Sequence, residues 1–123
     1  MEKVEGIGGF FFRTTDPAAL SAWYEKHLGI DPVPTGPEGQ SWQQNAGSTV
    51  FCPFPDDTDY FGDKSQKWMI NFRVRDLDAM LSQLQSAGID ASHHHKMEGI
   101  GRFARIHDPD GNPIELWQPI NLD

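Results

Sequence analysis

The chain has 123 residues, with 10 lysines and arginines against 18 aspartates and glutamates, so its formal net charge is −8 with histidine neutral. That length suits one domain that buries a core without disulfides. The hydrophobic content of 37% is that of a globular chain. The acidic balance disfavours nucleic acids and anionic membranes as partners, because both recruit basic residues, and the apolar runs are too short to span a bilayer.

The amino terminus and the single cysteine bear on the cellular compartment. Residues 1–5 contain no basic region followed by an apolar stretch, so no secretory signal is predicted. Cys52 is alone, which excludes an internal disulfide and a zinc cluster built from cysteines. We therefore expect a cytoplasmic protein. Because Cys52 follows an apolar run, it is predicted to lie in the core rather than to act as a nucleophile.

The first half predicts a strand, a helix and then short strands separated by turns. Residues 9–14 alternate in the manner of a strand. A helix is predicted after Asp16, which suits the N-cap, with Pro17 at its first position and Gly29 at its C-terminal cap. Residues 31–39 are rich in proline and glycine and are predicted to be a loop.

An acidic connector over residues 53–59 separates the two halves. Aromatic residues surround it, namely Tyr60, Phe61 and Trp68. They either pack the connector onto the core or form a dimer contact, and the sequence favours neither.

The second half repeats the pattern. Residues 69–74 alternate as a strand, and a helix is predicted after Asp76 with Gly88 as its stop. Residues 108–112 predict a tight turn between two strands, with Gly111 at positive φ, rather than a calcium loop. The run of histidines at residues 93–95 is the most conspicuous metal candidate, but its polar surroundings favour a solvated loop.

The two halves align with each other at a nearly constant offset. The aligned pairs are Phe12 with Phe72, Arg13 with Arg73, Asp16 with Asp76, and Val50 with Ile114. We interpret this as two copies of one supersecondary unit, with a first module at about residues 1–56 and a second at about residues 65–123. Together they form a single domain over residues 1–123.

Two segments resemble the vicinal oxygen chelate superfamily, which includes glyoxalases, bleomycin-resistance proteins and extradiol dioxygenases. The opening resemblance rests on Phe12-Arg13, Asp16, Trp23-Tyr24 and Leu28-Gly29, and the closing one on residues 108–117. The resemblance implies an α+β fold of two tandem βαβββ modules, whose curved mixed sheets form a shared cleft. It also implies a homodimer.

Enzymes of this superfamily usually hold a divalent metal at four positions, which the resemblance places on Gly9, Phe51, Met69 and Glu115. Only Glu115 offers a strong ligand, because Gly9 and Phe51 have no donor atom and Met69 has only a soft thioether. We therefore expect no metal and no other cofactor.

Residues in phase with these four positions are expected to face the cleft. The predicted ligand-binding residues are Phe11, Arg13, Phe51, Met69, Asn71, Arg73, Phe103, Arg105 and Trp117. His107 shares the phase of Phe103 and Arg105. Aromatic walls with few polar groups suit a small-molecule site.

The resulting hypothesis is a protein that binds a small aromatic or carboxylated ligand without the usual metal. Arg13 and Arg105 would anchor an anion through their guanidinium groups. Glu115 is the candidate catalytic residue, as a hydrogen-bond acceptor or a base. It could instead pair with one of the arginines and only stabilise the cleft.

Two other functions stay open. One is a lyase, isomerase or dioxygenase that uses either a relocated metal site, with Glu115 and a histidine, or metal-free acid–base chemistry at Glu115. The other is a structural dimer that binds no small ligand.

Overall fold

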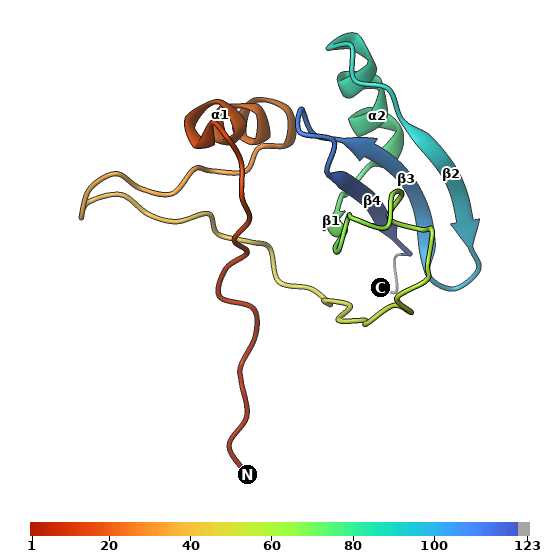
Figure 1. Cartoon of the computed structure of the whole chain (residues 1–123), viewed down its shortest axis with the longest axis horizontal. Coiled ribbons are helices and arrows are strands. Elements are labelled where there is room, and N and C mark those ends of the chain that lie inside the picture. The colour runs from red at the N-terminus through yellow and green to blue at the C-terminus, as the bar shows by residue number, and fades with distance from the viewer. Residues whose placement is uncertain (121–123) are drawn as a thin grey trace.

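The computed structural model describes residues 1–120, which form two helices and one mixed sheet of four strands (Figure 1). In chain order the elements are α1 (Pro17–Leu28), β1 (Ile70–Arg73), α2 (Leu77–Ser86), β2 (Ser92–Met97), β3 (Gly101–His107) and β4 (Pro113–Pro119). The protein is therefore α+β, with one βαβββ unit in its second half. No helix within residues 1–120 is long and apolar enough to cross a membrane.

The strand that comes last in the chain lies inside the sheet. The strand order is β1-β4-β3-β2, so β1 and β2 are the edges. β1 pairs with β4 in parallel, whereas β4 pairs with β3, and β3 with β2, in antiparallel fashion. Successive side chains of each strand point to opposite faces of the sheet, so one face packs on the core and the other does not.

The face of the sheet toward the helices is apolar. Ile106 on β3 and Ile114 and Leu116 on β4 are 0% exposed. They share one core cluster with buried residues of both helices, namely Leu20, Tyr24, Leu77 and Leu84. Burying one such aliphatic side chain contributes about 1.5–3 kcal/mol, so this cluster is the main source of stability.

The predicted ends of both helices are confirmed. Asp16 caps α1 and Asp76 caps α2, each through a carboxylate that accepts from a backbone N–H of the first turn. Pro17 begins α1, and Gly29 ends it in the left-handed region at φ 71°. After α2, Gly88 has a φ of 81°, which a residue without a side chain adopts at little cost.

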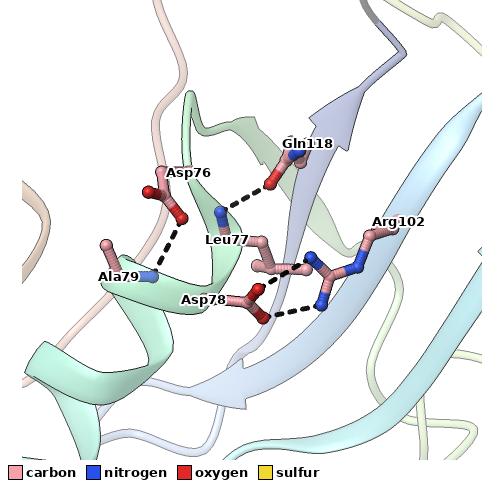
Figure 2. A network of polar contacts seen from close by, with 6 residues as sticks. All are labelled: Asp76, Leu77, Asp78, Ala79, Arg102 and Gln118. Atoms are coloured by element: carbon pink, nitrogen blue, oxygen red, sulfur yellow. Dashed lines mark hydrogen bonds and ion pairs between the residues drawn. The ribbon is translucent and has the colours of Figure 1, made fainter.

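The start of α2 is held by the sheet as well as by its own cap (Figure 2). The side-chain oxygen of Gln118 on β4 accepts from the backbone N–H of Leu77 at 2.8 Å. Asp78 in the first turn forms an ion pair with Arg102 of β3 at 2.7 Å. The Gln118 contact satisfies an N–H group that a helix leaves free at its start, and the two contacts together fix α2 across β3 and β4.

The predicted tight turn between β3 and β4 is also confirmed, and it anchors α1. The backbone N–H of Gly111 donates to the carbonyl of Asp108 at 2.9 Å, and Gly111 has a φ of 81°. The Tyr24 hydroxyl of α1 donates to the buried Asp108 carboxylate at 2.7 Å. One aspartate thus closes the turn and ties the first half to the second.

The strands expected in the first half are absent: residues 1–69 contain α1 but no strand. The prediction for residues 9–14 is therefore wrong as secondary structure, although Phe12 still packs against the core. In Figure 1 the chain before α1 and the chain that follows α1 run extended, away from the strands, and the connector then crosses the sheet before β1. Alternation alone does not make a strand, because its backbone groups need a neighbouring strand to pair with.

Two local predictions are also corrected. Cys52 is exposed rather than buried, since the extended segment that carries it has no core to enter. The histidines at residues 93–95 lie in β2, not in a loop, and are exposed as expected. Their strand contains a register shift between Ser92 and His95, and His93 has a φ of 53°.

Candidate functional site

The face of the sheet away from the helices carries two rows of the predicted side chains, one polar and one aromatic. The strand register places Asn71, Glu115 and Arg105 side by side, and we call these the polar row. The next position along the strands aligns Trp117, Phe103 and His95, which we call the aromatic row. Core residues alternate with these positions along β3. Phe103 and Arg105 therefore point away from the core, which is the face expected for them.

The Glu115 carboxylate, on the central strand, is 9% exposed. Asn71 of β1 donates to its Oε1 at 2.8 Å. The Tyr60 hydroxyl donates to its Oε2, and Tyr60 belongs to residues 53–69, the whole segment before β1, which we call the connector from here on. These two neutral donors can stabilise the charged carboxylate without neutralising it.

The guanidinium of Arg105 is buried at 4% exposure but poorly satisfied. Its Nη2 contacts the Met69 sulfur at 3.3 Å, and a thioether is a weak acceptor. Its Nε is buried without a hydrogen-bond partner among the described residues. The ring of Tyr60 lies over the guanidinium, 4.6 Å from its carbon to the ring centroid. Arg105 is thus a buried cation that contacts no carboxylate of residues 1–120.

Arg105 and Glu115 are register partners, yet no ion pair joins them. Among residues 1–120 the side-chain ion pairs are Lys96–Glu98 and Arg102–Asp78. The alternative in which Glu115 pairs with an arginine is therefore wrong for this structure. Each of the two charged groups keeps capacity for a further partner.

The aromatic row forms a stack across three strands. The rings of Phe103 and Trp117 are 6.0 Å apart at 3°, and those of His95 and Phe103 are 4.8 Å apart at 9°. Phe103 is 8% exposed, whereas His95 and Trp117 are more open. The indole nitrogen of Trp117 donates to the carbonyl of Ile100 at 3.2 Å, which fixes the ring.

The predicted residues outside these rows are spread more widely. Met69 and Arg73 flank the rows, but Arg73 turns to the first half and donates to the carbonyls of Asn45 and Ala46 at 2.9 and 3.3 Å. Phe11 is 92% exposed and Phe51 is 85% exposed. Both belong to the segments that were expected to form strands, so they do not join the rows.

Arg13 likewise does not join Arg105. It is exposed and lines a surface hollow with Thr14, Thr15 and Asp110. A second hollow, within the described part of the chain, is formed by the loop over residues 32–39. The described residues therefore do not enclose the shared cleft expected from two modules, and Tyr60 covers the charged members of the polar row.

Tyr60 is the residue that sequence reasoning placed least well. It contacts both charged members of the polar row, although it was assigned only to packing or a dimer contact. Burial, the hydrogen bond to Glu115 and the charge of that carboxylate raise the pKa of Tyr60 to about 12, although Arg105 lowers it. The only available signal was an aromatic residue next to an acidic connector, which has no periodicity to orient it.

His107 shares the face of Arg105, at the end of β3. Burial and the charges of Arg105 and His93 lower the pKa of its imidazole, with Asp108 acting in the opposite direction. A neutral imidazole accepts as well as donates hydrogen bonds, so His107 adds a polar group at one end of the face.

The four positions at which relatives hold a metal do not fit one here. Gly9 and Phe51 have no donor atom and stay outside the rows, and the Met69 sulfur is occupied by the cationic Arg105. A second positive charge beside that guanidinium would be repelled. Within residues 1–120, no group of three or more histidine, cysteine, aspartate or glutamate side chains is placed to hold a metal ion.

Comparisons with known proteins agree with this fold. Residues 9–117 match the family described as glyoxalase-like domain. An antibiotic-binding protein, TnmS3 from Streptomyces sp. CB03234, is 21% identical, with a TM-score of 0.66 over 98% of this chain and 100% of that one. A glyoxylase/bleomycin resistance protein/dioxygenase domain from Frankia sp. EAN1pec is 15% identical, with a TM-score of 0.61 over 96% of this chain and 100% of that one. No curated protein matches the sequence.

Proposed function

The chain belongs to the glyoxalase-like domain family of the vicinal oxygen chelate superfamily, and we propose that it binds a small aromatic or carboxylated ligand without that superfamily's usual metal. The ligand lies on the face of the sheet that carries the polar and aromatic rows. Its acidic group meets Arg105, and its ring meets the stacked aromatic side chains.

The unsatisfied guanidinium of Arg105 carries the proposal. A charge 4% exposed loses most of its hydration, and a buried N–H without a partner costs about 1–3 kcal/mol. An arginine with a purely structural role normally offsets this cost by pairing with a carboxylate, but Glu115 does not pair with Arg105. A carboxylate on the ligand would supply the missing partner in the bidentate geometry that arginine favours.

The aromatic row supplies the apolar part of the site. Phe103 and Trp117 present nearly parallel rings beside Arg105, so a planar ligand could add to the stack. The similar protein from Streptomyces binds an antibiotic, but at 21% identity that likeness extends only to the fold. The argument for a ligand therefore depends on the residues of this chain.

The expected homodimer and second sheet belong to the same proposal. Apolar side chains in the first half are open to solvent, among them Phe11 at 92%, Val50 at 72% and Phe51 at 85%. We propose that these segments pair as strands in a dimer and complete a two-module cleft that brings Phe11, Arg13 and Phe51 to the ligand. Analytical ultracentrifugation of the wild-type chain and of Phe51→Ser tests this, and a wild-type monomer at micromolar concentration would contradict it.

The ligand site is tested by isothermal titration calorimetry with benzoate, salicylate and larger fused-ring aromatic acids. Arg105→Ala should weaken binding by about 1.5–3 kcal/mol, the usual contribution of a hydrogen-bonded charge. Arg75→Ala is the matched control, because Arg75 is exposed and follows β1 outside the rows. Arg13→Ala tests separately whether the first module contributes to ligand binding. Absence of any binder, or an Arg105→Ala variant that binds as wild type, would refute the site.

An enzyme of lyase, isomerase or dioxygenase type is the second candidate. The observation in its favour is the buried Glu115 carboxylate on the ligand face, which is placed to act as a base. Glu115→Gln would then keep ligand binding and abolish turnover. Stoichiometric iron, manganese, nickel or zinc in untagged protein, lost in Glu115→Ala, would overturn the metal-free proposal.

A further inference from the structure

Tyr60 occupies the centre of the polar row, although it comes from the connector and not from the sheet. Its ring covers the guanidinium of Arg105 at 4.6 Å, and its hydroxyl donates to Glu115. A single side chain therefore engages both charged groups that the proposed ligand would use. In chemical terms this side chain is a phenol: an aromatic ring for the cation and an O–H donor for the carboxylate.

The phenol of Tyr60 leaves part of the hydrogen-bonding capacity of Arg105 unused. The Nε–H is buried without an acceptor, and Nη2 reaches only the sulfur of Met69. A phenol ring cannot accept in the plane of the guanidinium as a carbonyl or carboxylate oxygen does. A ligand with an acceptor next to its hydroxyl-bearing ring would accept from the Arg105 Nε–H, which Tyr60 leaves without a hydrogen bond.

We propose that Tyr60 is a resident competitor in the ligand site, and that the ligand is a hydroxyaryl acid or ketone that replaces it. This inference rests on the proposed function and names its ligand class. The ligand's hydroxyl takes the place of the Tyr60 hydroxyl on Glu115, its ring covers Arg105, and its carbonyl or carboxylate oxygen accepts from the Arg105 Nε–H.

The connector gives Tyr60 a means to leave the site as part of a unit. Phe54 and Phe61 pack with each other at 4.9 Å, and Phe54 stacks on Tyr60 at 5.9 Å and 15°. The turn that carries Tyr60 ends at Gly62, whose φ of 95° suits glycine. These contacts lie within the connector, so its aromatic cluster can separate from the polar row without breaking the sheet.

Competition makes a specific prediction about affinity. If Tyr60 holds the site for most of the time, the observed dissociation constant is the intrinsic value divided by the fraction of open sites. Tyr60→Ala should therefore bind salicylate or 4-hydroxybenzoate about tenfold more tightly than wild type, and Tyr60→Phe, which loses only the hydroxyl, about threefold more tightly. Arg75→Ala is the control here as well, because Arg75 is exposed and lies outside the rows and the aromatic cluster of the connector.

Calorimetry with four probes separates the contributions of the ligand's groups. Salicylate and 4-hydroxybenzoate carry both the hydroxyl and the acid, whereas phenol and benzoate carry one each. The proposal expects the two-group probes to bind most tightly, and their advantage over benzoate to disappear in Glu115→Ala, which has no acceptor for the hydroxyl. Equal affinity of all four probes, or weaker binding by Tyr60→Ala than by wild type, would overturn it.

Displacement can also be observed in the intact chain. The sequence has two tyrosines, Tyr24 and Tyr60, so 3-fluorotyrosine labelling gives two ¹⁹F resonances, and Tyr60→Phe assigns them. Salicylate should shift the Tyr60 resonance toward that of a solvated tyrosine and leave Tyr24 unchanged. An unchanged Tyr60 resonance at saturating salicylate would refute competition while leaving ligand binding intact. Absence of binding by wild type and by both Tyr60 variants would refute the proposed function itself.

Discussion

The two halves of the chain share one sequence pattern, but only the second half forms the strands that this pattern predicts. In the second half, Ile114 occupies the core at 0% exposure, whereas its counterpart Val50 in the first half is 72% exposed. Likewise, Glu115 is 9% exposed while Phe51 is 85% exposed. The helices, by contrast, form in both halves with the same aspartate cap. Local signals thus act alike in both halves, and strands form only where neighbours complete them.

The largest effect should come from the paired positions Ile114 and Val50. Ile114→Ala removes fully buried methyl groups and should lower the free energy of unfolding by about 2–5 kcal/mol. Val50→Ala should change it by less than about 0.5 kcal/mol in dilute protein. Urea denaturation at several protein concentrations measures both. A large effect of Val50→Ala that grows with concentration would show that the first half buries this residue in an assembly, and the contrast between the halves would then hold only for the isolated chain.

The next effect concerns the contact that joins the halves. Tyr24→Phe leaves the buried Asp108 carboxylate without its 2.7 Å donor and should cost about 1–3 kcal/mol. Asp108 keeps the backbone N–H groups of Asp110 and Asn112, which hold the turn. Thermal unfolding of the variant should therefore show a less stable chain with the same sheet content. An unchanged melting temperature would mean that α1 is held by packing alone.

The same tyrosine gives this contact a pH dependence. Burial, the hydrogen bond to Asp108 and the charges of Asp108 and Asp110 raise the pKa of Tyr24. Its contribution to stability is then complete below about pH 10, the ordinary tyrosine value, and is lost as pH rises above it. Wild type should lose more stability than Tyr24→Phe between pH 9 and 11 (a range set by that ordinary value). Equal losses would contradict the assignment.

A smaller and equal effect is expected at the two helix caps. Asp16→Ala and Asp76→Ala should each lower the free energy of unfolding by about 1 kcal/mol, because each leaves an N–H of the first turn without its acceptor. The asparagine variants should retain most of the stability as controls. If only Asp76→Ala were destabilising, α1 would have to unfold separately from the sheet, and the halves would differ even in their helices.

The smallest effect belongs to the exposed ion pair at the start of α2. The Arg102 guanidinium lowers the pKa of Asp78, so this contribution is present above about pH 4 and is lost as pH falls through that range. Asp78→Asn should destabilise slightly at low salt and not at all in about 1 M salt. Ala18 is the equivalent residue of α1, and Ala18→Asp should bring no such gain. A salt-independent loss in Asp78→Asn would show that packing, not charge, holds Arg102.

The sequence predicted the features that depend on near neighbours. Asp16, Pro17 and Gly29 bounded α1 because caps act within one turn. Side-chain alternation along the expected strands gave the face away from the core for Asn71, Arg105 and Glu115, which lie on β1, β3 and β4. Phe11, Arg13 and Phe51 were placed by assuming strands in the first half, and residues 1–69 form none in this structure. Pairing of strands is decided by distant residues, so no local pattern could reveal its absence.

Tyr60 shows a different limit of sequence reasoning. Its contacts depend on where the connector crosses the sheet. The connector has no regular spacing of apolar residues, so its sequence does not predict that position. The lack of an ion pair between Arg105 and Glu115 has the same origin. Opposite charges on adjacent strands predict a bond, but here the Tyr60 side chain contacts both groups.

The central place of β4 also determines the order in which the sheet can assemble. β3 and β4 are joined by a short turn, whereas the parallel contact between β1 and β4 closes a much longer loop, with Asn71 and Glu115 separated by 44 positions. Closing that loop costs more chain entropy, so the hairpin should form first and β1 should dock last. Asn71 would then join the polar row in the final step, and amide exchange should be slower in β3 and β4 than in β1.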